Sequence, residues 1–99
     1  MPLQVRVKPR ARQEILRAAQ WWHLNCPAAP GAIDSDLKAA LSALVEQPGI
    51  GSLVSNARDT GTRRLYLVRT GYFVYYRPKG QFLDVVAFWH ASRGSEPSV

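Results

Sequence analysis

The residues best suited to chemistry in this sequence are His90 and Arg93, which follow Trp89 at the end of an aromatic, β-branched run. A histidine exchanges protons near neutral pH, and an arginine binds phosphate or carboxylate groups through paired N–H donors. Two hypotheses are open for His90. It acts in catalysis, or, as we favour, it is a strand-end side chain hydrogen-bonded to backbone or to a neighbouring hydroxyl.

Three runs of alternating, aromatic-rich sequence position this cluster and predict three antiparallel strands. Thr70-Gly71 joins the first two strands as a two-residue hairpin turn, in which the glycine supplies the positive φ that such turns need. The turn residues at 78–80 join the second strand to the third. The predicted strands cover residues 63–69, 72–77 and 82–90.

The second of these turns sets the expected pairing of the last two strands. It places Arg77 opposite residue 81 or 82, and it places His90 beside Tyr72 at the far end of the hairpin. A close contact between His90 and Arg77 is therefore not expected.

The first half of the chain alternates briefly and then becomes helical. Leu3, Val5 and Val7 alternate with polar residues, which is the period of a strand with one buried face. Apolar residues at three- and four-residue spacing predict helices over residues 10–25 and 32–47. Because a short segment rich in proline joins them, the two helices should pack as an antiparallel hairpin.

These elements predict one α+β domain. The fold class is a small antiparallel sheet packed against an N-terminal helical hairpin, in the order β-α-α-β-β-β. Residues 49–61 lack periodicity, and we expect a loop that connects the helices to the strands; a functional loop is the alternative. The single domain should span residues 1–94, followed by a short flexible tail at residues 95–99.

An excess of basic residues indicates an anionic partner. Thirteen Lys and Arg stand against seven Asp and Glu, which gives a formal net charge of +6. That charge fits either nucleic acid or an acidic protein segment. The basic start of the chain is equally open between a phosphate-binding footprint and an edge strand kept from self-association by charge. This start contains Arg6, Lys8, Arg10, Arg12 and Arg17.

Several classes of chemistry are excluded by what the sequence lacks. Cys26 is the only cysteine, so no intramolecular disulfide is possible. No metal-ligand spacing, glycine-rich phosphate loop or pair of catalytic carboxylates is present, and we expect no metal and no cofactor. No segment has the character of a secretory signal or approaches membrane-spanning length, so a cytoplasmic location without membrane contact is expected.

Short motifs follow one another along nearly the whole chain. They are Trp21-Trp22, the break at Pro27 and Pro30, Leu41 and Leu44 before Gln47-Pro48-Gly49-Ile50-Gly51, Arg63-Arg64-Leu65, Tyr75-Tyr76-Arg77, and Trp89-His90 before Arg93-Gly94. In this order and spacing, the set resembles the ParE branch of the RelE/ParE superfamily. These proteins are the toxins of type II toxin–antitoxin systems.

The resemblance implies a partner and two kinds of target. An antitoxin with an acidic, amphipathic tail wraps such toxins, which fits the positive net charge. ParE-like toxins are associated with poisoning of DNA gyrase, whereas RelE-like relatives cut mRNA in the ribosomal A site with basic residues on the middle strands. Tyr66 and Phe73 occupy two of those positions here, and no tyrosine follows Tyr76. This departure argues against strong RNase activity.

Three functions therefore remain. The leading hypothesis is a non-enzymatic toxin that inhibits gyrase. The second is a ribosome-dependent mRNA endoribonuclease that uses Arg64, His90 and Arg93. The third is a non-toxic member that acts only in an autoregulatory complex with its antitoxin. For the leading hypothesis, the expected target contacts are Arg64, Arg77, Trp89, His90 and Arg93.

Neutralisation by an antitoxin predicts a second surface. Apolar grooves at the junction of helices and sheet should receive hydrophobic anchors of the partner, while arginines meet its acidic side chains. The expected contacts are Arg12, Arg17, Trp21, Leu24 and Leu67.

Overall fold

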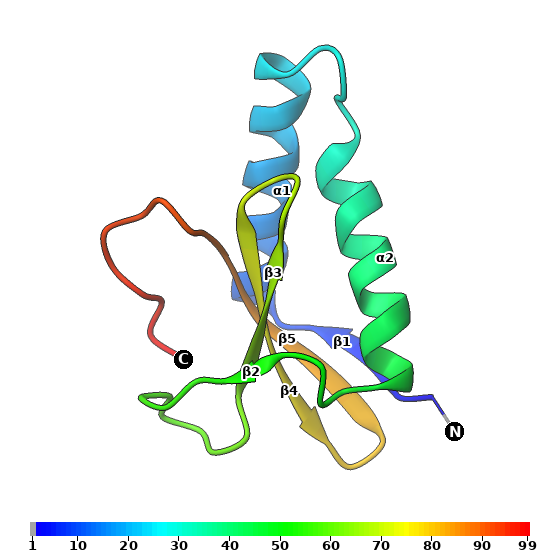
Figure 1. Cartoon of the computed structure of the whole chain (residues 1–99), viewed down its shortest axis with the longest axis vertical. Coiled ribbons are helices and arrows are strands. Elements are labelled where there is room, and N and C mark those ends of the chain that lie inside the picture. Colours follow the sequence, from blue (N-terminus) through cyan, green and yellow to red (C-terminus); the bar gives the residue numbers. More distant parts are fainter. Residues whose placement is uncertain (1) are drawn as a thin grey trace.

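Two helices cover one face of a five-stranded sheet, as the computed structural model shows for residues 2–99 (Figure 1). The predicted element order and the helical hairpin are confirmed. One further strand lies in the segment expected to be a loop. The elements are β1 (Gln4–Val7), α1 (Pro9–Asn25), α2 (Ala32–Glu46), β2 (Ser52–Leu53), β3 (Arg63–Leu67), β4 (Tyr72–Lys79) and β5 (Phe82–His90).

The sheet has the strand order β1-β5-β4-β3-β2 and is mixed rather than wholly antiparallel. Strands β2 to β5 pair antiparallel, whereas β1 lies parallel to β5. The reason is the connection. Both helices lie between β1 and the later strands along the chain, and such a long crossover allows the parallel pairing that a tight hairpin forbids.

Strand β2 corrects the prediction of a plain loop at residues 49–61. Ser52 and Leu53 pair with the first two residues of β3. The backbone just before β2 is held by Tyr76, whose buried hydroxyl accepts the Gly51 N–H at 2.9 Å and donates to the Pro48 carbonyl at 2.7 Å. Burial raises the pKa of Tyr76. The end of α2 is thereby tied to the centre of the sheet.

Both predicted hairpin turns differ from the observed ones. Strand β3 ends at Leu67, so the first connection has four residues, with Gly71 at a φ of 80°. Strand β4 continues through Pro78 to Lys79, and the second turn lies at Gly80-Gln81. Arg77 therefore pairs with Asp84, not with residue 81 or 82.

Alanines allow α1 to lie close to β5. Ala11 and Ala18 are buried in the core, where they meet the inward-facing side chains of the sheet. Strand β1 ends opposite Val85, so the edge of β5 beyond that point has no strand partner. Glu14 of α1 covers it, because its Oε1 accepts the Phe88 backbone N–H at 2.9 Å.

A charged pair joins β1 to β5 on the outer face of the sheet, the face turned away from the helices. Arg6 donates from Nε to Asp84 Oδ1 at 2.7 Å and from its terminal nitrogen to Oδ2 at 3.1 Å. The Asp84 side chain is only 3% exposed. The hydrogen bond from Arg6 holds the pKa of Asp84 below its ordinary value of 3.8.

Residues 95–99 lie against this outer face, an arrangement that the sequence did not predict. Val99 is 8% exposed and packs with Tyr75 and Ala87. The segment has no regular secondary structure.

The depressed pKa of Asp84 predicts loss of stability in acid. Because the folded state binds this proton less readily than the unfolded state, the stabilisation is present above the ordinary pKa of 3.8 and disappears as the pH falls through the lower folded value. Asp84→Asn should lower the unfolding free energy by about 1 to 2 kcal/mol at pH 7. The difference from wild type should shrink below the ordinary pKa in urea titrations.

Glu46 supplies the matched control, since it is an exposed acid on α2. Glu46→Gln should leave the acid dependence of stability as in the wild type. An Asp84→Asn protein whose deficit stays constant down to low pH would contradict the proposed role of the Arg6 hydrogen bond.

The Tyr76 tether predicts a strict need for glycine at position 51. A Cβ on Gly51 would lie 2.5 Å from the Tyr76 hydroxyl and 2.7 Å from the Arg64 carbonyl oxygen. Gly51→Ala should therefore cost several-fold more stability than Gly49→Ala, whose Cβ would meet nothing within 4 Å. Tyr76→Phe should cost about 1 to 3 kcal/mol, because the Gly51 N–H loses its partner. Equal denaturation midpoints for the two alanine variants would refute this account.

Candidate functional site

The outer face of the sheet carries an aromatic and basic surface built from alternate residues of β3, β4 and β5. The Arg64 guanidinium lies 4.3 Å from the centre of the Phe73 ring and donates to the Tyr75 hydroxyl at 3.2 Å. Tyr66 and Phe73 are neighbours across the strands, with ring centres 5.1 Å apart. Arg64 is therefore held in place by rings, as cation–π contacts favour.

Trp89 and Arg93 continue this surface at the end of β5. The Arg93 guanidinium stacks 3.7 Å above the Trp89 ring, and the Trp89 indole N–H donates to the Ser95 carbonyl at 2.7 Å. Arg10 approaches the same ring from α1, at 5.8 Å. Two cations thus lie within about 6 Å of the Trp89 ring.

His90 lies on the opposite, helix-facing side of β5. Its ring meets Tyr72 edge to face at 4.7 Å, and Tyr72 stacks on the core residue Phe88 at 4.6 Å. The Ser92 backbone N–H donates to His90 Nδ1 at 3.1 Å, and the Ser92 hydroxyl is 2.7 Å from the same nitrogen. Since Nδ1 accepts a hydrogen bond, the neutral ring carries its proton on Nε2. These are the contacts of a strand-end histidine held by backbone and a hydroxyl.

Four of the five predicted target-contact residues border one depression of about 260 Å³ at this end of the sheet. The fifth, Arg77, lies apart from them. It donates to the Thr62 hydroxyl at 3.1 Å and pairs with Asp59 at 3.1 Å, so it holds the loop between β2 and β3. The four that come together are Arg64, Trp89, His90 and Arg93.

A second hollow lies on the helix side of the same strand end. It has a volume of about 340 Å³, and both Arg17 and Trp21 of α1 line it together with His90 and Arg93. Tyr72 lies in its wall; burial raises the pKa of Tyr72, and the charge of Arg93 opposes that shift. The end of β5 is therefore a ridge between two hollows, one on each face of the sheet.

The residues predicted to contact an antitoxin separate into two groups. Arg17, Trp21 and Leu24 lie at i, i+4 and i+7 on α1, where Trp21 is 54% and Leu24 71% exposed. Arg12 is also exposed on this helix. Leu67 is different: it is 7% exposed and belongs to the core, because inward-facing positions of β3 pack against α2. Its prediction as a contact residue is corrected accordingly.

Two exposed apolar features were missed in the sequence. Leu16 is 62% exposed on α1. It lies outside the apolar stripe of that helix, and this position could have indicated its exposure from the sequence. Val68 is 83% exposed in the β3–β4 connection, which was predicted as strand.

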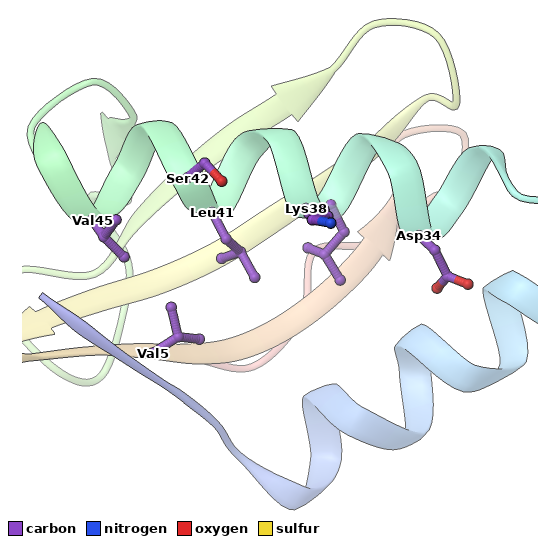
Figure 2. A pocket seen from close by; sticks show the side chains of 7 residues that line it. Val5, Asp34, Lys38, Leu41, Ser42 and Val45 are labelled. Carbon is purple, nitrogen blue, oxygen red and sulfur yellow. The ribbon is translucent and has the colours of Figure 1, made fainter. Parts of the chain in front are cut away.

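An apolar groove between α2 and the edge strand β1 was also missed (Figure 2). Its volume is about 400 Å³, and Val5, Leu41 and Val45 point into it from both sides. Strand β1 has only four residues and forms the edge of the sheet, so it leaves part of the α2 stripe uncovered. Asp34 and Lys38 mark the polar end of this groove.

Two negative findings apply to the described part of the chain. Across residues 2–99, no group of three or more His, Cys, Asp or Glu side chains is placed to hold a metal ion. No helix among the same residues has the length and apolar character needed to cross a membrane.

Three solved structures share this fold at low sequence identity. A chain of the chromosomal ParDE system from P. aeruginosa has a TM-score of 0.71 and 15% identity, and the match covers 89% of this chain and 95% of that one. For the RelBE2 toxin–antitoxin complex of Mycobacterium tuberculosis, the values are 0.60 and 20%, with 91% and 99% covered. A mutant of the E. coli toxin RelE in the free state gives 0.58 and 18%, with 93% and 86% covered.

Sequence comparison assigns the family. No curated protein matches the chain directly. The family model for the ParE toxin of the type II toxin–antitoxin system parDE matches residues 5–94, which include both helices and all but the first residue of the sheet. The chain therefore belongs to the ParE toxin family of type II toxin–antitoxin systems.

Proposed function

We propose that this ParE-family toxin inhibits DNA gyrase by binding it, without cleaving nucleic acid, and that an antitoxin with an acidic tail neutralises it. The make-up of the outer sheet face carries the proposal. Its centre is filled by the rings of Tyr66 and Phe73, and Arg64 is engaged by a ring, a hydroxyl and Glu96. Aromatic rings with fixed arginines are typical of surfaces that recognise protein.

Few residues on the outer sheet face are placed for the cleavage of RNA. Cleavage of RNA needs a proton acceptor within hydrogen-bond reach of the attacking hydroxyl and several cations around the phosphate. His90 Nδ1 is occupied by Ser92, and its ring lies on the other face of the sheet from Arg64. These observations favour a toxin that acts by binding.

The exposed side of α1 supports the antitoxin part of the proposal. Trp21 and Leu24 leave more than half of their surface exposed, and Arg12 and Arg17 offer positive charge on the same helix. An amphipathic acidic segment matches both properties, since its apolar side chains would cover the former and its carboxylates would meet the latter.

Purified toxin should inhibit supercoiling by gyrase and trap a cleavage complex. Arg93→Ala should raise the concentration for half inhibition about tenfold, as expected when an interface arginine worth about 1.4 kcal/mol is removed. Arg58→Ala is the matched control, because it removes the same charge from an exposed loop position. Inhibition curves from a plasmid supercoiling assay measure the half-inhibiting concentrations of the wild type and both variants. A wild-type protein without effect on gyrase would refute the proposed target.

Ribosome-dependent RNA cleavage is the second candidate function, because Arg64, His90 and Arg93 border one depression. Primer extension on translated mRNA tests it after induction of the toxin. The proposed function predicts no toxin-dependent cuts. Cuts that disappear in the Arg64→Ala variant would establish the endoribonuclease instead.

A third test separates a toxin from a purely regulatory relative. Induction of the chain without antitoxin should arrest growth. Normal growth at a verified protein level would mean that the fold serves only in the autoregulatory complex.

Charge reversal on α1 should slow association with the antitoxin. Changing both Arg12 and Arg17 to Glu should lower the association rate constant about tenfold at low salt and flatten its salt dependence, because steering by opposite charge is lost. Lys79→Glu is the control, since Lys79 is an exposed cation on β4 away from this helix. Stopped-flow mixing with the antitoxin measures the rates. An unchanged rate and salt slope would show that these arginines do not guide the encounter.

A further inference from the structure

We propose that the outer face of the sheet is a recognition groove for an extended acidic segment of a partner protein, and that residues 95–99 occupy this groove in the free chain. The inference goes beyond the proposed function, because it rests on contacts within the chain and holds whatever the toxin's target is. Each part of the segment meets a different feature of the groove.

The first feature is a carboxylate site. Glu96 Oε1 lies 3.4 Å from the Arg64 guanidinium, and its Oε2 accepts from the Asn56 amide at 3.2 Å. The Tyr75 hydroxyl accepts from the same Arg64 nitrogen and holds the guanidinium toward the carboxylate. A carboxylate is thus bound by two donors that come from different elements, β3 and the loop after β2.

The second feature is a small apolar site. Val99 is 8% exposed and packs with Tyr75 and Ala87, where Val54 and Ala57 form the rim. Tyr75 is itself only 1% exposed. This site holds a small apolar side chain three positions after the acid.

The third feature is a pair of donors that hold the backbone of the segment. The Trp89 indole N–H donates to the Ser95 carbonyl at 2.7 Å, and an Arg10 terminal nitrogen donates to the Ser98 carbonyl at 2.6 Å. Both bonds go to main-chain oxygens, so they bind any extended chain. Selectivity therefore comes from the acid at the first site and the apolar residue at the second.

The ionic contact of the built-in segment is its weakest one. The Glu96 side chain is 54% exposed, and exposed ion pairs contribute little to stability because water screens them. A partner segment that makes additional contacts along the groove would displace residues 95–99 and bind to Arg64 and Trp89 in their place. The segment is thus an internal competitor that sets a threshold for binding at this face.

A peptide fits the groove better than nucleic acid does. Arg64 and Arg93 would attract a phosphate, but the Val99 site is lined mainly by apolar side chains, which suit a side chain such as valine better than a second phosphate. The groove binds one carboxylate, that of Glu96, and then buries one valine. A peptide can supply both groups, whereas a nucleic acid supplies neither.

The test uses the full chain and a dye-labelled synthetic peptide with the sequence of residues 94–99, Gly-Ser-Glu-Pro-Ser-Val. Its binding is measured by fluorescence anisotropy. The double variant Glu96→Gln, Val99→Ser should release the internal segment and bind the peptide at least about tenfold more tightly than the wild type. Adding Arg64→Ala to that variant should abolish the gain. Ser98→Ala, which changes only an exposed side chain, should behave as wild type.

Three outcomes would overturn the proposal. Equal affinity of the wild type and the double variant would show that the segment does not compete. Absence of binding by a folded double variant would show that the face does not recognise peptides. Binding of a short RNA oligonucleotide in place of the peptide, again dependent on Arg64, would identify a phosphate site.

An NMR measurement keeps the proposal testable if the double variant is unstable. The Trp89 indole N–H is hydrogen-bonded to Ser95, so its signal should shift and exchange faster with water in the single variant Glu96→Gln. The indole signals of Trp21 and Trp22 should stay in place. An unchanged Trp89 signal in this folded variant would mean that Glu96 does not hold the segment. None of these readouts involves gyrase, so they stand apart from the test of the target.

Discussion

The pairing of β4 with β5 is the constraint on which the candidate site depends. Tyr75 pairs with Ala87 and Tyr76 with Val85, so Val86 is an extra residue in β5. Before this bulge, odd-numbered residues of β5 face the helices; after it, even-numbered ones do. One inserted residue therefore turns Trp89 outward and His90 inward, as bulges re-aim the side chains that follow them. Without it, His90 would share a face with Arg64.

This division gives the two sides of the strand end different chemistry. On the outer side, rings immobilise Arg64 and Arg93, and their charges serve recognition. On the inner side, His90 joins an aromatic stack with Tyr72 that continues into the core. Arg64, His90 and Arg93 thus border one depression, but the contacts of the His90 ring lie on the inner side of the sheet and those of the two guanidinium groups on the outer side. A surface of this kind favours binding over catalysis.

The sequence predicted both helices and the order of the elements along the chain, because those depend on local periodicity. The prediction that His90 lies beside Tyr72 was made from the second turn and is confirmed, although the turn itself lies at residues 80–81. The bulge at Val86 was not predictable in this way, since nothing in the alternation of β5 marks an unpaired residue. The exposure of Leu67 and of residues 95–99 was predicted wrongly for a related reason. Burial depends on which residues pack against a position in the folded protein, and the sequence pattern around that position does not give this.

The Arg6–Asp84 pair, finally, has a consequence for how the chain folds. Its two residues are 78 positions apart in the sequence, and all of the pairing between β1 and β5 shares this long separation. Because closing so long a loop costs much chain entropy, we expect these contacts to form after the helices and the β3–β5 meander. During synthesis on the ribosome, β1 has no strand to join until β5 has emerged. The surface formed by the end of β5 is therefore assembled only after residues 82–90 have been made.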